Sequence, residues 1–102
     1  FSRGDADLDL LASIPGDRFF HVQVADARAE RLPDIRQDTQ HRALPGDGVL
    51  DLVGILRVLH RTGGLACVGP EVFSPGLLAM PTADAAALAD ARVRSVVEEA
   101  RP

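Results

Sequence analysis

An alternation of strand-like and helix-like segments constrains the fold of this chain more than any other feature. Residues 18–25 (RFFHVQVA) and 65–73 (LACVGPEVF) are rich in β-branched and aromatic residues, which favour strands. Residues 50–62 between them, and the segment that begins at Thr82, instead repeat their apolar residues at helical spacing. Strands that alternate with helices in this way indicate βα units and a parallel sheet.

The helical segments are also marked by their ends. Residues 5–14 begin with Asp and stop before Pro15-Gly16, and the helix over 50–62 closes at Gly63-Gly64, because glycine readily adopts the left-handed conformation that helix ends prefer. We expect Thr82 to be the N-cap of the last helix. The apolar residues expected to face the core are Leu8, Leu11 and Ile14, then Leu52, Ile55, Leu56 and Leu59, and finally Ala89, Val93, Val96, Val97 and Ala100.

A long polar segment, residues 26–48, separates the first strand from the following helix. Loops of this length inside a compact domain are usually functional or mobile. The segment ends in HRALPGDG, where Pro45 fixes φ and the glycines on either side of Asp47 permit a sharp return toward the helix. Asp47 or Asp51 can cap the first turn of that helix.

Charge and composition exclude several classes of function. The net charge of −4 argues against a nucleic acid or an anionic membrane as partner, because both are bound through clustered positive charge. Every basic residue is Arg, so the segment lacks the lysine that a Schiff base or a P-loop requires. The apolar runs are far shorter than the roughly 20 residues of a membrane span, and no secretory signal begins the sequence. Cys67 cannot form an internal disulfide, and we expect it to be a small buried hydrophobe in a reducing, cytoplasmic compartment.

Strand periodicity separates the side chains of each predicted strand into an apolar face and a more polar one, because successive side chains point to opposite faces. In the first strand Phe20, Val22 and Val24 share the apolar face, opposite Phe19, His21, Gln23 and Ala25. In the second strand Val68, Pro70 and Val72 share the apolar face, opposite Cys67, Gly69 and Glu71.

Gln23 and Glu71 lie toward the carboxyl ends of these strands, the end at which α/β sheets and barrels bind ligands. Amide and carboxylate oxygens suit Mg²⁺ or Mn²⁺, and His21 on the same face leaves Co²⁺ or Zn²⁺ open. The alternatives are an ion-paired or solvated Glu71 and a His21 that donates to a backbone carbonyl. The sequence therefore predicts two candidate metal ligands.

The motifs FFHVQVADA, HRALPGDGVLDL and GGLACVGPEVFSPGL together resemble the C-terminal part of the xylose isomerase-like TIM barrels, the sugar phosphate isomerase/epimerase superfamily. The resemblance covers nearly the whole chain, with the motifs in the family's order. It implies that residues 1–102 are the C-terminal portion of a (β/α)₈ barrel, with about two to three βα units and parallel strands. Residues that precede this segment would supply a further Glu, Asp and His of the site.

The resemblance also implies roles for individual residues. Gln23 and Glu71 would bind the metal, and the Gln variant is similar to the 3-dehydroshikimate dehydratase branch. Arg42 would contact the anionic or polar end of the substrate, since its planar guanidinium recognises a carboxylate or phosphate in a bidentate manner. From the residues alone, His41 is expected at the surface, although its place beside Arg42 would let it reach the substrate, and His21, on the same face as Gln23, is the candidate catalytic residue behind the metal ligands. Asp26 would order the loop. An ordinary surface role is the alternative for Arg42.

Three hypotheses about function remain open. The first is a metal-dependent sugar or sugar phosphate isomerase or epimerase, in which a base removes the proton next to a metal-polarised carbonyl. The second is a metal-dependent dehydratase, a lyase that acts on a cyclic hydroxy-keto acid such as 3-dehydroshikimate. The third is a non-catalytic α/β module that binds or assembles. Because two βα units leave strand edges open, we expect the rest of the barrel or a second copy of the chain to cover them.

Overall fold

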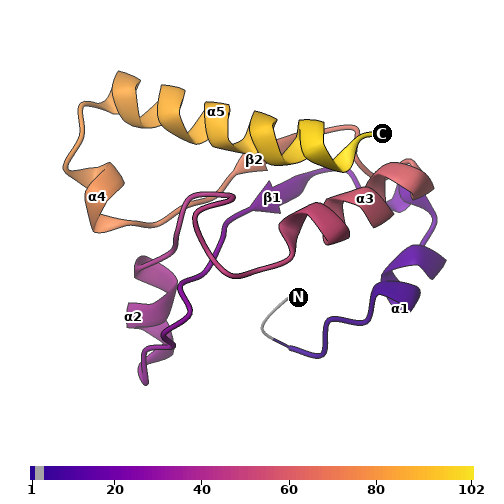
Figure 1. Ribbon diagram of the computed structural model, residues 1–102, viewed down its shortest axis with the longest axis horizontal. Coiled ribbons are helices and arrows are strands. Elements are labelled where there is room, and N and C mark those ends of the chain that lie inside the picture. Colours follow the sequence, from indigo (N-terminus) through magenta and orange to yellow (C-terminus); the bar gives the residue numbers. More distant parts are fainter. Residues whose placement is uncertain (2–3) are drawn as a thin grey trace.

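The computed structural model describes Phe1 and residues 4–102. Two strands, β1 (Val22–Val24) and β2 (Val68–Pro70), form a parallel sheet, as the alternation of segments predicted. In Figure 1, α2 and α4 lie at the end of the molecule toward which the β1 arrow points, and α1 lies near the opposite end. The helical elements, in chain order, are α1 (Leu8–Ser13), the 3₁₀ turn η1 (Gly16–Arg18), α2 (Ile35–Gln40), α3 (Leu52–Thr62), α4 (Pro75–Leu78) and α5 (Thr82–Ala100).

The core lies between the sheet and the two long helices. Helices α3 and α5 pack against each other, α5 also packs against β2, and α1 packs against α3 (Figure 1). Val24 is buried in this core, and Val22 and Val68 pack against it from the same sheet face. The helices therefore cover the apolar sheet face, which leaves the face of Gln23 and Glu71 on the other side. The buried residues of α3 are Leu52, Leu56, Val58 and Leu59, and those of α5 are Ala89, Val93, Val96, Val97 and Ala100.

The ends of the long helices match the sequence in part. Asp51 caps α3 by accepting a hydrogen bond from the Gly54 N–H at 2.9 Å, and Gly63 ends the helix with φ of 80°. The prediction for α5 is wrong, because Thr82 is already helical and Pro81 occupies the N-cap position without a side-chain hydrogen bond. Proline there sets an extended entry into the helix, which leaves Thr82 no capping role.

Both strands are shorter than predicted, at three residues each. The predicted alternation fails at the start of the first strand, where Phe19 packs against the core and Phe20 is 86% exposed. The cause is the η1 turn, which ends at Phe19 and interrupts the extended backbone before β1. Gly64 leaves room for the Phe19 ring, since a Cβ at Gly64 would lie 2.8 Å from it.

Helix α2 lies inside the segment that the sequence indicated as a loop. Asp34 caps it by accepting from the Arg36 N–H at 2.8 Å. The helix has six residues and no apolar stripe, so hydrophobic periodicity could not reveal it. None of the helices described is both long enough and apolar enough to cross a membrane.

Candidate functional site

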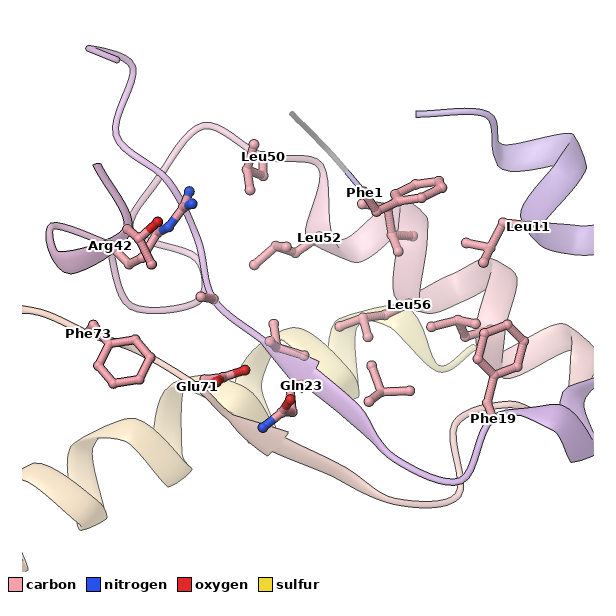
Figure 2. Close-up of a pocket in the computed structure, with 16 residues that line it drawn as sticks. Phe1, Leu11, Phe19, Gln23, Arg42, Leu50, Leu52, Leu56, Glu71 and Phe73 are labelled. Carbon is pink, nitrogen blue, oxygen red and sulfur yellow. The ribbon is translucent and has the colours of Figure 1, made fainter. Parts of the chain in front are cut away.

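Gln23 and Glu71 lie at the carboxyl ends of the two paired strands and line one cavity of about 610 Å³ (Figure 2). Gln23 pairs in register with Gly69, and Glu71 follows two residues later, where its N–H donates to the Val24 carbonyl at 3.0 Å. Residues two apart on a strand share a face, so Gln23 and Glu71 project from the same side of the sheet. Both residues are exposed, so a ligand can reach them in this segment.

The cavity has a polar end and an apolar wall. Arg42 and Phe73 lie with Gln23 and Glu71 at the end formed by the two strand-end loops (Figure 2), and Thr39 also lines the cavity. The apolar wall extends along the other side of β1 toward α1 and α3, and it is formed by Phe1, Leu11, Phe19, Val22, Val24, Ala25, Leu50, Leu52, Ile55, Leu56 and Leu59. A site of this kind can bind a small molecule that has an apolar body and an anionic end.

Arg42 is held between the two strand-end loops. Its backbone N–H donates to the Phe73 carbonyl at 2.9 Å, which connects the loop after β1 to the loop after β2. One nitrogen of its guanidinium lies 3.7 Å from the Asp38 carboxylate, and the Arg42 side chain is 23% exposed. Arg42 is therefore a half-buried cation, held where the two strand-end loops meet, that lines the same cavity as the metal-ligand candidates.

Asp26 organises the loop that carries Arg42. It is 1% exposed, and its carboxylate accepts from the N–H groups of Ala27 at 2.8 Å, Leu50 at 3.0 Å, Gly46 at 3.1 Å and Gly48 at 3.0 Å. Its backbone also forms an antiparallel bridge with Ala43, one residue after Arg42. The expectation that Asp26 orders the loop agrees with these contacts.

The Pro-Gly-Asp-Gly turn has the special geometry that its sequence indicated. Gly46 has φ of 87°, a region that residues with a side chain rarely adopt. A Cβ at Gly48 would collide with the Asp26 carboxylate and the Ala27 carbonyl, so only glycine allows the backbone to approach Asp26. Asp47 does not cap α3 but forms an ion pair with Arg92 of α5 at 2.9 Å. The turn is thus attached to both β1 and α5.

His21 lies on the face of Gln23 but is absent from the cavity lining. Its Nδ1 is 3.2 Å from Cys67 Sγ, and its ring lies beside Gly69. Cys67 is exposed, so the expectation of a buried small hydrophobe is wrong. Parity already places Cys67 on the face that the helices leave uncovered, which is why it is not buried.

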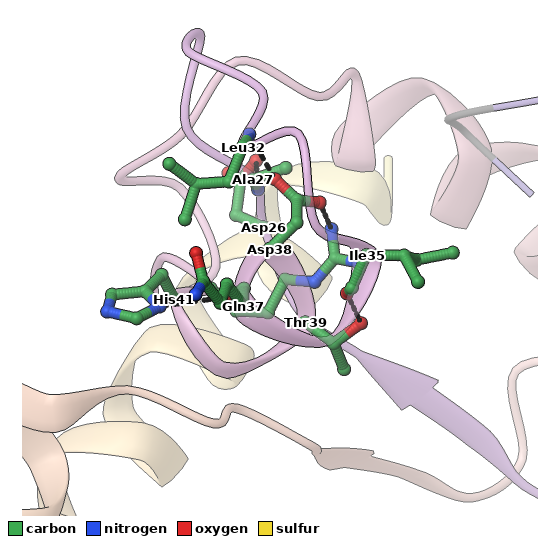
Figure 3. Close-up of polar contacts among 9 residues, drawn as sticks. Asp26, Ala27, Leu32, Ile35, Gln37, Asp38, Thr39 and His41 are labelled. Carbon is green, nitrogen blue, oxygen red and sulfur yellow. Dashed lines mark hydrogen bonds and ion pairs between the residues drawn. The ribbon is translucent and has the colours of Figure 1, made fainter.

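His41 does not line the cavity and instead contacts helix α2. It follows the last residue of α2, and its Nδ1 donates to the Gln37 carbonyl at 2.7 Å (Figure 3). It is half-buried and does not line the cavity that Arg42 lines. The structure therefore places Gln23, Glu71 and Arg42 around one cavity, whereas neither His21 nor His41 lines it.

Three residues near the site were not found from the sequence. Thr39 and Asp38 belong to the unpredicted helix α2, and Phe73 ends the second predicted strand. Their roles depend on how the two loops meet, for which the sequence carries no periodic signal. The spacing of Asp38 and Arg42, four residues apart, was the one available signal, because residues so spaced face each other when the chain is helical.

The donor set fits a divalent metal without completing its coordination. Gln23 and Glu71 offer an amide and a carboxylate oxygen on one face, the ligand types of hard divalent cations. In the part of the chain described, no group of three or more His, Cys, Asp or Glu side chains could hold a metal ion. Further ligands would have to come from outside this segment.

Parallel strands joined by a helical crossover, with a cavity at their carboxyl ends, are the features of part of an α/β barrel. No protein-family profile matches the chain. The chain is similar over 93% of its length to a xylose isomerase domain protein from Alicyclobacillus acidocaldarius, with 30% identity and a TM-score of 0.72. It is similar to a xylose isomerase-like TIM barrel/4-hydroxyphenylpyruvate dioxygenase fusion protein with 33% identity and a TM-score of 0.79. The IolI protein, solved with a bound zinc atom, shares the fold at 22% identity and a TM-score of 0.83. The chain therefore has the fold of part of a xylose isomerase-like TIM barrel.

Two curated relatives extend the comparison. The 3-dehydroshikimate dehydratases of Pseudomonas putida and Pseudomonas aeruginosa are each 35% identical to this chain, over 79% and 76% of its length. The chain spans only 13% and 12% of those relatives. It likewise spans 34%, 15% and 33% of the solved IolI, fusion and Alicyclobacillus proteins.

Proposed function

We propose that this chain contributes part of the active site of a metal-dependent dehydratase that acts on 3-dehydroshikimate or a similar cyclic hydroxy-keto acid. The observation that carries the proposal is the meeting of Gln23, Glu71 and Arg42 in one cavity at the carboxyl ends of two parallel strands. Two oxygen ligands and one fixed cation are what a substrate with a carbonyl and a carboxylate requires.

The chain's own residues would bind and orient the substrate. A divalent metal (Mg²⁺, Mn²⁺, Co²⁺ or Zn²⁺) held by Gln23, Glu71 and ligands from outside this chain would polarise the substrate carbonyl. Arg42 would pair with the carboxylate of the substrate. Asp26 would keep Arg42 in place through the loop that it organises. His21, on the face of Gln23, stays the candidate for proton transfer within this segment.

The reaction needs no oxidant or reductant. A base removes the proton next to the carbonyl, the neighbouring hydroxyl leaves as water, and a carbon–carbon double bond forms. The same first step, followed by return of the proton to the other carbon or the other face, gives an isomerase or epimerase, which is the second candidate. The two dehydratase relatives favour loss of water, and the half-buried Arg42 favours an acid over a neutral sugar.

The test uses the complete protein that contains this segment. Purified protein, stripped with a chelator and reloaded with each of the four metals, is incubated with 3-dehydroshikimate or with ketose phosphates. We expect metal-dependent formation of 3,4-dihydroxybenzoate, seen by its ultraviolet absorbance, and loss of that activity in Gln23→Ala and Glu71→Ala with folding retained. Conversion of a ketose phosphate instead would select the isomerase, and full activity in both variants would overturn the proposed ligand pair.

A further inference from the structure

Asp38 contacts Arg42 without lining the cavity of Gln23 and Glu71. Arg42 lines both that cavity and a second hollow of about 460 Å³, whereas Asp38 lines only the second one. Arg42 thus borders both spaces. Its contact with Asp38 occupies one nitrogen and leaves the rest of the donor fork for a ligand in the first cavity.

The Asp38 carboxylate is itself fixed. Its side chain is 9% exposed, and one oxygen accepts from the Leu32 N–H at 3.2 Å (Figure 3). The other oxygen lies 3.7 Å from Arg42. Its backbone N–H donates to the Asp34 carbonyl at 2.9 Å within α2. A carboxylate this buried requires partners, and the segment before α2 and the loop after it both provide them.

We infer that Asp38 is a positioning residue that fixes the Arg42 guanidinium for the carboxylate of a substrate in the first cavity. This inference rests on the proposed function, since it assigns the acid end of that substrate to Arg42. A long arginine side chain loses rotamer freedom when it binds a ligand, and an arginine already held by Asp38 loses less. Asp38 would therefore contribute to the preference for an acid over its neutral analogue without touching the substrate.

The test compares an acid with its amide in the complete protein. Isothermal titration calorimetry measures binding of 3,4-dihydroxybenzoate and of 3,4-dihydroxybenzamide to the wild type and to Asp38→Asn. We expect the wild type to prefer the acid, and Asp38→Asn to lose about tenfold in affinity for the acid, the change expected when one hydrogen bond of a charged group is weakened. Affinity for the amide should stay within about twofold, the ordinary scatter for a residue that touches nothing on the ligand.

Two control variants separate positioning from a general effect on α2. Asp34→Ala removes the N-cap of the same helix without touching Arg42, and it should leave the preference for the acid unchanged. In an Arg42→Gln background the preference should already be lost, and Asp38→Asn should then change it no further. Equal losses for acid and amide in Asp38→Asn, or the same loss in Asp34→Ala, would overturn the inference.

A failure of this inference can be distinguished from a failure of the proposed dehydratase function. Turnover of 3-dehydroshikimate tests the dehydratase, whereas binding of the acid and the amide tests Arg42 and Asp38. A protein whose preference for the acid depends on Arg42 and Asp38 as expected, but which has no dehydratase activity, would overturn the first proposal alone. A wild type that does not prefer the acid overturns the inference even if the enzyme turns over.

Discussion

Replacing Asp26 with asparagine should detach the loop that carries Arg42 from the end of β1. In the native chain each carboxylate oxygen accepts two backbone N–H groups, from Ala27 and Leu50 on one side and from Gly46 and Gly48 on the other. Asparagine keeps one acceptor and turns an NH₂ group toward the other pair, so two donors lose their acceptor and face another donor.

The size of the effect follows from the charge and burial of Asp26, which is 1% exposed. Hydrogen bonds to a buried charged group contribute roughly 1.5–3 kcal/mol each, so the loss of two should cost roughly 3–6 kcal/mol. A cost of that size is a large part of the roughly 5–15 kcal/mol that stabilises a typical domain. The loop should therefore open locally before the protein as a whole unfolds.

The assay measures global unfolding and local opening of the loop, both in the complete protein. Urea denaturation gives the free energy of unfolding, and hydrogen exchange of residues 43–50 gives the local opening. Asp47→Asn is the matched control on the same loop, because its half-exposed ion pair with Arg92 should contribute less than about 1 kcal/mol. If Asp26→Asn costs no more than Asp47→Asn and leaves exchange of the loop unchanged, the assignment of Asp26 as organiser of the site is refuted.

Three more predictions concern the fold. Gly48→Ala should destabilise the protein and impair Arg42-dependent binding, because the new Cβ would collide with the Asp26 carboxylate. Gly63→Ala is the comparison: Gly63 has φ of 80°, which strains alanine, but a Cβ there would meet no atom within 4 Å. It should therefore alter stability without altering binding. Leu56→Ala, at 2% exposure, should lower the free energy of unfolding by roughly 2–5 kcal/mol, and an equal loss from Ile35→Ala, at 79% exposure, would contradict the core described above. Residues 1–102 expressed alone should self-associate in analytical ultracentrifugation, because a two-stranded sheet with open edges and an exposed Phe20 recruits partners; a stable monomer would count against the need for the rest of a barrel.

The sequence predicted the parts of the fold that depend on periodic burial. The stripe of α5 and the apolar face of α3 were visible because a helix that packs on one side repeats its buried residues every three or four positions. The parallel pairing followed from the order of elements, and strand parity put Gln23 and Glu71 on one face. These features depend only on local backbone geometry, so the order of apolar and polar residues along the chain is enough to predict them.

The tertiary structure decided what depends on the meeting of distant segments. Strand parity placed Phe20 on the core face, but the η1 turn puts Phe19 against the core and leaves Phe20 exposed. Cys67 was expected to be buried, but it is exposed on the sheet face that the helices do not cover. The hydrogen bond from Arg42 to Phe73 and the contact with Asp38 arise only when two loops come together, and no periodicity records that encounter. Local patterns specify which face a side chain takes, whereas the position of a charge in a site is fixed by contacts between loops that are far apart in the sequence.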